Sequence, residues 1–314
     1  MTEPTLALTL AAAALLVLAF VAGAAIYVAS TYALAHRHAP RGVRSALRDM
    51  IRELTWTILV QPLLPLYWLF GRRMGPLLQG EAAVHHRPVV FVHGYAQNRV
   101  DFVRIARALQ RRGFAHLFGF NYPWLASLAG NARRLARFVD EVRAETGAEQ
   151  VDLVCHSMGG LVAMQYLHRD GGSTRVARCV TIATPFKGVR WRGPLLGRAA
   201  IDLRQGFAFP DRPPAGSGTR MLSIYSRHDN VVHPVETSSL ALAGGRDLEA
   251  GTMGHLAILF EPSVADAVAE FLVEEAPPTR VEVAVEPTAK AEAAAAEAQT
   301  DEADLPADVA RAAR

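Results

Sequence analysis

Cysteine and lysine are both scarce in this 314-residue chain. It contains two cysteines, Cys155 and Cys179, and two lysines, Lys187 and Lys290. Two cysteines in separate apolar segments have neither the spacing of a metal site nor the pattern of a disulfide framework, so we expect buried free thiols. The basic residues are almost all arginines, and they are scattered without an accompanying aromatic platform. This distribution argues against nucleic-acid binding.

Charge is absent from the beginning of the chain. No charged side chain occurs between Glu3 and Arg37, and the stretch LALTLAAAALLVLAFVAGAAIYVAS is apolar almost throughout. A helix of roughly 20 such residues crosses a bilayer core, so we predict a single-pass transmembrane anchor over residues 1–36, in a bacterial inner membrane. A cleaved signal peptide is the alternative, because Ala33–Ala35 resembles a cleavage site. The start MTEP, however, carries an acid and no base.

Residues 37–84 form a basic juxtamembrane segment followed by an apolar segment. Five arginines follow the predicted span, with only Asp49 and Glu53 against them, and this favours a cytoplasmic flank. The uncharged stretch Leu54–Gly71 contains two prolines, which disfavour a regular helix. It is interpreted as a second span, an interfacial segment or part of the domain surface. A second span would move the large domain to the opposite side, so the sequence leaves the topology open.

Aromatic residues and large aliphatic clusters are missing from residues 276–314. This stretch is rich in Ala and Glu and contains 4 basic and 8 acidic side chains. It cannot bury enough apolar surface to fold alone, so we predict a disordered acidic tail.

Residues 85–275 alternate between apolar, β-prone runs and segments of helical periodicity. Continuous apolar strands that alternate with helices predict an α/β fold, with a mostly parallel sheet covered by helices on both faces. In such sheets, sites form beyond the carboxyl ends of the strands. The expected strands are 88–94, 116–123, 150–157, 178–185 and 220–229, and the expected helices are 101–113, 131–147, 159–169 and 262–275.

The segment VDLVCHSMGGLVAMQYL leads from a predicted strand through a serine and two glycines into a helix. A serine hydroxyl becomes a nucleophile when a base takes its proton, and a sharp strand-to-helix turn exposes it to substrate. The usual pattern is Gly-x-Ser-x-Gly. Here it reads Cys155-His156-Ser157-Met158-Gly159, so a cysteine occupies the first small position. The alternative is an ordinary tight turn that happens to contain a serine.

The segment VVFVHGYAQN ends another predicted strand. Gly94 permits a turn that exposes the following backbone amides. The N–H of Tyr95, together with that of Met158, would then form an oxyanion hole for acyl chemistry. The alternative is an ordinary glycine turn in which His93 is a structural hydrogen bonder.

The segment MLSIYSRHDNVVHP places a carboxylate at a strand end. Asp229 at this position would hold the imidazole of a base in the correct tautomer. The alternative role is a turn cap next to Asn230. Asp211 and Asp247 are weaker candidates, because one lies in a Pro/Gly-rich loop and the other follows a glycine pair.

The candidate base is His255, which lies in GTMGHLAIL before the final helix. His233 is the rival, but it lies close to Asp229 in the sequence. With His255 the chain order becomes Ser, Asp, His, which is one of the known orders of serine hydrolase triads. Because these features occur in that order, we predict that Ser157 is reactive.

The segments VHGYAQN, VCHSMGGLVA, TIATPFKGV, YSRHDNVV and GHLAIL together resemble the α/β-hydrolase superfamily, in particular its bacterial lipase- and esterase-like members. They extend over residues 85–275. The cysteine before the serine departs from the family's usual glycine. The resemblance implies an α/β-hydrolase fold with a nucleophile, an acid, a base and an oxyanion hole at Ser157, Asp229, His255 and Tyr95/Met158, respectively.

Residues 187–219 hold aromatic and leucine side chains among Gly and Pro, and we interpret them as a lid or cap that supplies an apolar acyl pocket. A plain surface excursion is the alternative.

The expected function is a membrane-anchored serine hydrolase acting on lipid or acyl-chain esters. An acyltransferase or thioesterase with the same triad, and a non-catalytic membrane scaffold, are the alternatives. The expected partners are the ester substrate and the bilayer, and the mechanism requires no metal or cofactor.

Overall fold

The computed structural model describes residues 3–38, 40, 42–68, 71–76, 82–190, 196–204, 214, 217–240 and 245–274. The predicted tail at 276–314 lies outside the described residues, as do parts of the predicted lid. Contacts divide the chain into Met1–Val273 and Glu274–Arg314, and every element named below belongs to the first unit.

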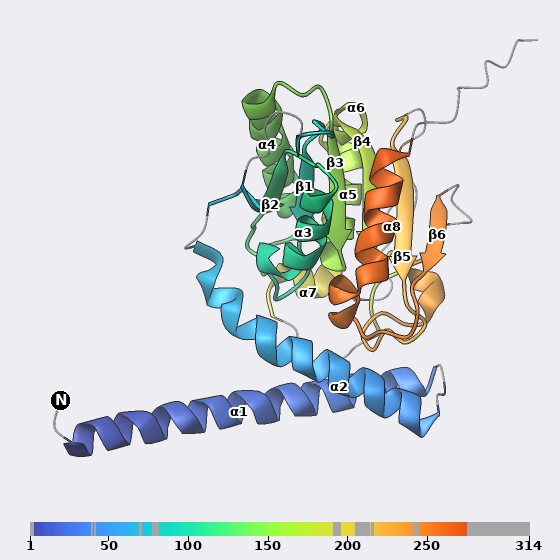
Figure 1. The fold of residues 1–314 in the computed structure, drawn as a ribbon. Coiled ribbons are helices and arrows are strands. Elements are labelled where there is room, and N and C mark those ends of the chain that lie inside the picture. Colours follow the sequence, from blue (N-terminus) through green and yellow to red (C-terminus); the bar gives the residue numbers. More distant parts are fainter. Residues whose placement is uncertain are drawn as a thin grey trace, which may run out of the picture. The chain divides into compact units, whose positions relative to one another are not determined.

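Within the described residues, six parallel strands form one sheet in the order β2-β1-β3-β4-β5-β6 (Figure 1). The first five in the chain correspond to the predicted strands. The residues of β1, β2 and β3 are all buried, which explains their continuous apolar sequences. The bounds are β1 Val89–Val92, β2 Leu117–Phe120, β3 Val151–His156, β4 Val176–Ile182, β5 Arg220–Tyr225 and β6 Arg246–Glu249.

Helices connect the strands, as the periodicity predicts. The predicted helices correspond to α3, α4, α5 and α8. A short 3₁₀ turn, η3, precedes α3. The bounds are α1 Glu3–His36, α2 Val43–Val60, α3 Val103–Arg111, α4 Leu128–Thr146, α5 Met158–Arg169, α6 Gly172–Arg175, α7 Arg198–Asp202 and α8 Pro262–Val273, with 3₁₀ helices η1 Gln61–Trp68, η3 Arg99–Phe102, η4 Val235–Thr237 and η6 Ala257–Phe260.

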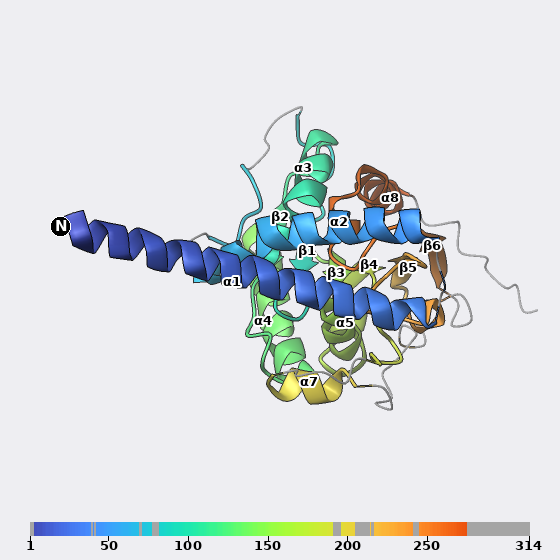
Figure 2. The same cartoon turned by 90° about the horizontal axis from the view of Figure 1, so that it is seen from below.

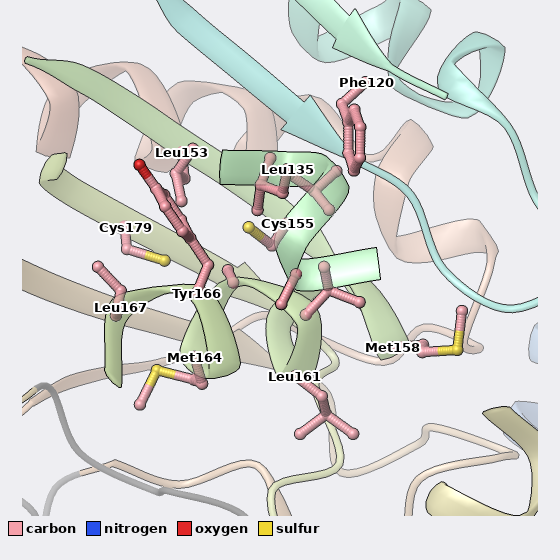
Figure 3. Close-up of a cluster of buried hydrophobic side chains, with 14 of the residues drawn as sticks. Phe120, Leu135, Leu153, Cys155, Met158, Leu161, Met164, Tyr166, Leu167 and Cys179 are labelled. Carbon is pink, nitrogen blue, oxygen red and sulfur yellow. The ribbon is translucent and has the colours of Figure 1, made fainter. Parts of the chain in front are cut away.

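Two apolar layers cover the sheet, as expected for parallel strands buried on both faces. Side chains of α4 and α5 pack on one face, and those of α3 and α8 pack on the other. Figure 3 shows the first layer, in which Cys155 of β3 and Cys179 of β4 lie beside Leu153 and Tyr166. Both cysteines are buried and free, so the prediction from their scarcity is confirmed.

Helix α1 corresponds to the predicted anchor. Among the described residues it alone is long and apolar enough to cross a membrane, and an 18-residue window within Thr5–His36 has a mean hydropathy of 2.5; a signal sequence would meet the same criterion. Its first half is exposed, whereas Val28, Thr31 and Tyr32 in its second half are buried against the rest of the unit. The helix is therefore divided into a solvent- or lipid-facing part and a part that packs on protein.

Helix α2 differs from the expectation for residues 37–84. Residues 43–60, which include the last part of the basic stretch and the first part of the apolar stretch, form one continuous helix that runs beside α1 (Figure 2). The prolines lie in the following 3₁₀ helix η1. The face of α2 that packs inward carries Asp49 and Glu53, which are 0% and 2% exposed, while its arginines face outward. Its acidic residues are thus the buried ones.

Candidate active site

Three side chains from separate strand ends meet in one hydrogen-bonded chain. The Nε2 atom of His255 lies 2.9 Å from the Oγ atom of Ser157, and its Nδ1 atom lies 2.8 Å from Oδ2 of Asp229. Ser157 follows β3, Asp229 follows β5, and His255 lies between β6 and η6. The structure therefore brings together the three residues that the sequence predicts as nucleophile, acid and base.

Ser157 sits on a strained turn between β3 and α5. Its φ and ψ are 50° and −123°, a conformation that costs free energy for a residue with a Cβ atom. Its N–H donates to the carbonyl of Ile182 at 2.8 Å, which fixes the turn against β4. A Cβ atom at Gly159 would overlap the carbonyl oxygens of Val92 and His93, so the second small position is sterically required. The cysteine in the first small position is accommodated within the core.

Asp229 uses its two carboxylate oxygens for different partners. Oδ1 accepts hydrogen bonds from the N–H groups of Val231 and Val232, at 2.7 and 2.8 Å, and Oδ2 faces the imidazole of His255. Asp229 thus caps the turn and also contacts the imidazole, so both expected contacts are present, and its catalytic role stays a prediction. The cap holds the carboxylate in the orientation that the histidine needs.

The imidazole of His255 is shielded, with a side chain 12% exposed. Burial, the largest single influence, disfavours its charged form, but the charge and hydrogen bond of Asp229 together with the charge of Glu53 outweigh it. The net effect raises the pKa of His255 above its ordinary value. A raised pKa suits a group that must take a proton from a serine hydroxyl and return it to a leaving group.

The residues expected to form the oxyanion hole flank the serine. Met158 is the first residue of α5, so its N–H belongs to the positive end of that helix. Tyr95 follows Gly94, where an added Cβ atom would lie 3.0 Å from the Cβ of Ser157. The turn at Gly94 therefore approaches the serine closely. The role of the two amides as an oxyanion hole remains a prediction.

Sequence reasoning missed two polar residues that connect the parts of this site. The buried ring of His156 lies between Oε1 of Gln97, at 2.8 Å, and the carbonyl of His255, at 2.9 Å. Gln97 also accepts the N–H of Gly94 at 2.7 Å. Burial lowers the pKa of His156 well below its usual value, so the ring is neutral and has one N–H to donate. Its position next to Ser157 is the signal that would have identified it.

His233, the rival of His255, and His93 both have other contacts. The ring of His233 stacks on that of His38, with ring centroids 4.9 Å apart, whereas the carboxylate of Asp229 faces His255. His93 is buried, with Nδ1 2.9 Å from the carbonyl of Gly94 and Nε2 3.3 Å from the N–H of Tyr122. Burial lowers its pKa to about 4, so it is the neutral, structural hydrogen bonder considered above.

The weaker acid candidates do not join the site within the described residues. Asp247 lies in β6, where its Oδ1 accepts the N–H of Leu240 at 2.8 Å. Asp211 lies outside the described residues. Among the residues that are described, no group of three or more His, Cys, Asp or Glu side chains is arranged to hold a metal ion.

The described part of the predicted lid is anchored to the site. The hydroxyl of Tyr95 donates to the carbonyl of Leu196 at 2.8 Å and accepts its N–H at 2.6 Å. Asp202, at the end of α7, accepts the N–H of Leu128 at 3.0 Å. The lid interpretation rests mainly on Trp191, Leu195, Phe207 and Phe209, which lie outside the described residues.

Comparisons with known proteins bear on the fold that carries this site. Residues 87–196 match a family model described as alpha/beta hydrolase fold. A triacylglycerol lipase of Burkholderia plantarii is 32% identical over 159 residues, which cover 47% of this chain and 43% of that protein. The match thus spans less than half the length of that relative.

Solved structures show the same fold. The mature form of the Bacillus licheniformis lipase BlEst2 superimposes with a TM-score of 0.54 at 18% identity, covering 63% of this chain and 95% of that chain. Aspergillus fumigatus lipase B has a TM-score of 0.50 at 19% identity, covering 62% and 55%. The predicted resemblance and the α/β-hydrolase fold are confirmed, and the chain is similar to lipases and esterases.

Proposed function

We propose that this protein is a membrane-anchored serine hydrolase that cleaves carboxylic esters through an acyl-enzyme on Ser157. The observation that carries the proposal is the hydrogen-bonded chain from Ser157 through His255 to Asp229, at 2.9 and 2.8 Å. A non-catalytic scaffold has no need for this alignment at the end of a strained turn.

The chemistry follows from the positions of these atoms. Nε2 of His255 takes the proton of Ser157 as Oγ attacks the ester carbonyl, and Asp229 stabilises the resulting imidazolium. The negative charge that develops on the carbonyl oxygen is stabilised by the N–H groups of Tyr95 and Met158 and by the positive end of α5. His255 then protonates the departing alcohol, and water attacks the acyl-enzyme by the same route.

Lipid or acyl-chain esters are the proposed substrates. The similarity to a triacylglycerol lipase supports this class, and so does the shielding of Ser157, which is 8% exposed. The exposed first half of α1 supports anchoring, since its length and hydropathy suit a bilayer. A substrate that resides in the membrane would then be present where the enzyme is held.

A fluorophosphonate probe tests the proposal directly. We expect full-length protein in detergent to form an adduct on Ser157, located by peptide mass spectrometry. Ser157→Ala and His255→Ala should abolish the adduct, whereas His233→Ala should retain it. An unlabelled wild-type protein with a normal circular dichroism spectrum would reject the serine hydrolase assignment. Product analysis with and without an alcohol acceptor then separates hydrolysis from acyl transfer.

A further inference from the structure

A carboxylate from α2 reaches the loop that carries His255. Oε1 of Glu53 accepts the N–H of Leu256 at 2.9 Å, and Oε2 accepts the N–H groups of Leu256 and Ala257 at 3.1 and 2.9 Å. These two amides begin the turn into η6 directly after His255. The side chain of Glu53 is thus hydrogen-bonded to the backbone next to the candidate base.

Placing a carboxylate there is costly, because burial disfavours its charge. Glu53 is 2% exposed, and burial raises its pKa to about 6, although the two backbone hydrogen bonds and the positive charge of His255 act in the opposite direction. An apolar side chain would fill this space without that cost but would leave the two N–H groups without an acceptor. The acid therefore has a specific task at this point.

Gly254, the residue before His255, leaves space for the carboxylate of Glu53. A Cβ atom added to Gly254 would overlap the Glu53 carboxylate and would lie 2.7 Å from the hydroxyl of Tyr32 on α1. Only glycine leaves room for the carboxylate to approach the loop. Gly254 and Glu53 are thus complementary in shape, although α2 and this loop are far apart in the sequence.

Helix α1 holds the same loop by a second route. Nδ2 of Asn230 donates to Oγ1 of Thr31 at 2.8 Å, and Oδ1 of Asn230 accepts the N–H of His255 at 2.8 Å. The backbone of His255 is therefore fixed from α1 through Asn230, and the backbone of its two successors is fixed from α2 through Glu53.

We propose that Glu53 is a positioning residue of the esterase site, which acts by fixing the Gly254–Ala257 backbone so that the imidazole of His255 meets Ser157. This inference rests on the proposed function and deepens it. The N-terminal helices are then part of the catalytic apparatus as well as an anchor. The region matched by the hydrolase family model, residues 87–196, does not include them.

The charge of Glu53 affects the pKa of His255, which a side chain that only fills space would not do. The ionisable groups around His255 are Asp229, the neutral ring of His156 and Glu53 itself. Tyr27 and Tyr32 of α1 also lie close to Glu53. Because the Glu53 carboxylate contributes to the raised pKa of His255, removing the charge should lower that pKa.

The test compares Glu53→Ala, Glu53→Gln and the control Arg52→Ala in full-length protein in detergent. Arg52 is on the same helix and pairs with Glu261, so its loss weakens the docking of α2 without touching the His255 loop. We measure the rate constant of fluorophosphonate labelling, kcat and KM for a p-nitrophenyl ester, the pH profile and Tm.

We expect Glu53→Ala to slow labelling and to lower kcat by about 10–100-fold, with a smaller effect on KM, because a misplaced base costs rate and not binding. Glu53→Gln keeps one acceptor oxygen, so it should recover part of the rate. The acidic limb of the pH–activity profile of Glu53→Gln should also lie at lower pH than in wild type. Arg52→Ala should label at nearly the wild-type rate.

The outcomes separate the two proposals. Absence of labelling in wild type rejects the serine hydrolase itself. Normal labelling of wild type and of folded Glu53→Ala rejects only the positioning role. If Glu53→Ala does not fold, the Glu53→Gln variant decides. A labelling rate and an acidic limb of the pH–activity profile that both match wild type would overturn the proposal.

Discussion

The hydroxyl of Tyr95 is hydrogen-bonded to both backbone groups of Leu196, at 2.8 Å to the carbonyl and 2.6 Å to the N–H. The main-chain N–H of Tyr95 is predicted to be part of the oxyanion hole, whereas its side chain contacts the segment predicted as a lid. One residue thus connects charge stabilisation with the wall of the proposed acyl pocket, and a side-chain substitution separates the two roles.

Tyr95→Phe keeps the backbone N–H and removes only the hydroxyl. We expect kcat for a short acyl ester to change by less than about twofold. We expect kcat/KM for a long-chain ester to fall by about 3–10-fold, because the lost hydrogen bonds contribute about 1 kcal/mol to holding the segment. The measurement is a chain-length series of p-nitrophenyl esters. Tyr225→Phe, in β5, is the control, and a uniform loss across the series would contradict the lid role.

Asp229→Asn should lower kcat by on the order of 10³–10⁴-fold, because the imidazole loses both its orienting partner and the charge that stabilises its protonated form. The pKa of His255 should also fall, since Asp229 is the main group that raises it against burial. Activity needs a neutral base, so it declines as pH falls through this pKa. The acidic limb of the residual activity should therefore lie at lower pH than in wild type. An unmoved limb would show that another group controls the profile.

Asp101 provides a test of stability against pH. It is buried in η3, and burial raises its pKa from 3.8 to about 8. A raised folded-state pKa means that stability is greatest below the unfolded value and is lost as pH rises through about 8. Asp101→Asn removes this loss and should raise the free energy of unfolding at alkaline pH by roughly 1–3 kcal/mol, with little change in acid. Thermal unfolding across pH measures it. Asp266→Asn, at an exposed ion pair, should show no such trend.

Cys155→Gly restores the usual pattern before the serine. Cys155 is fully buried among core side chains, so the substitution leaves a small cavity and adds backbone freedom. We expect a loss of about 1–2 kcal/mol in unfolding free energy and an unchanged rate of Ser157 labelling in the folded fraction. Cys179→Ala, in the same layer, is the packing control. Faster labelling of the glycine variant would mean that the cysteine distorts the turn.

The cysteine itself should be inert in the native protein. Burial raises the pKa of the Cys155 thiol well above its ordinary value, which suppresses the reactive thiolate. We expect iodoacetamide to modify Cys155 only after unfolding, as followed by mass spectrometry. Rapid modification of folded protein would contradict the buried position.

Five of the strands were predictable, because most of their residues are buried and apolar. The meeting of Ser157, Asp229 and His255 followed from the expectation that the carboxyl ends of parallel strands lie at one edge of the sheet, and their catalytic roles stay a prediction. Strand β6 was not predictable, since its sequence RDLE is polar and largely exposed at the sheet edge. Local patterns carry no signal for a strand whose main contribution is backbone pairing with β5.

Glu53 escaped prediction for a different reason. An acid among arginines on a juxtamembrane helix is typical of a solvated face, and its partner Leu256 is 203 positions away in the sequence. Only the folded chain shows that the acidic face of α2 points inward. The same holds for Thr31, a residue in an apolar helix whose hydroxyl accepts a hydrogen bond from Asn230.

The division of α1 into an exposed half and a packed half also sets how the enzyme would meet its substrate. The exposed part from Thr5 to Gly23 is roughly 28 Å long at about 1.5 Å per residue, close to the thickness of a bilayer core. With that part in a bilayer, Ser157 is held at a fixed height above one leaflet. Collisions with substrate are then set by lateral diffusion in two dimensions. Turnover would follow the mole fraction of ester in the membrane, so adding inert lipid would slow the enzyme at constant bulk concentration.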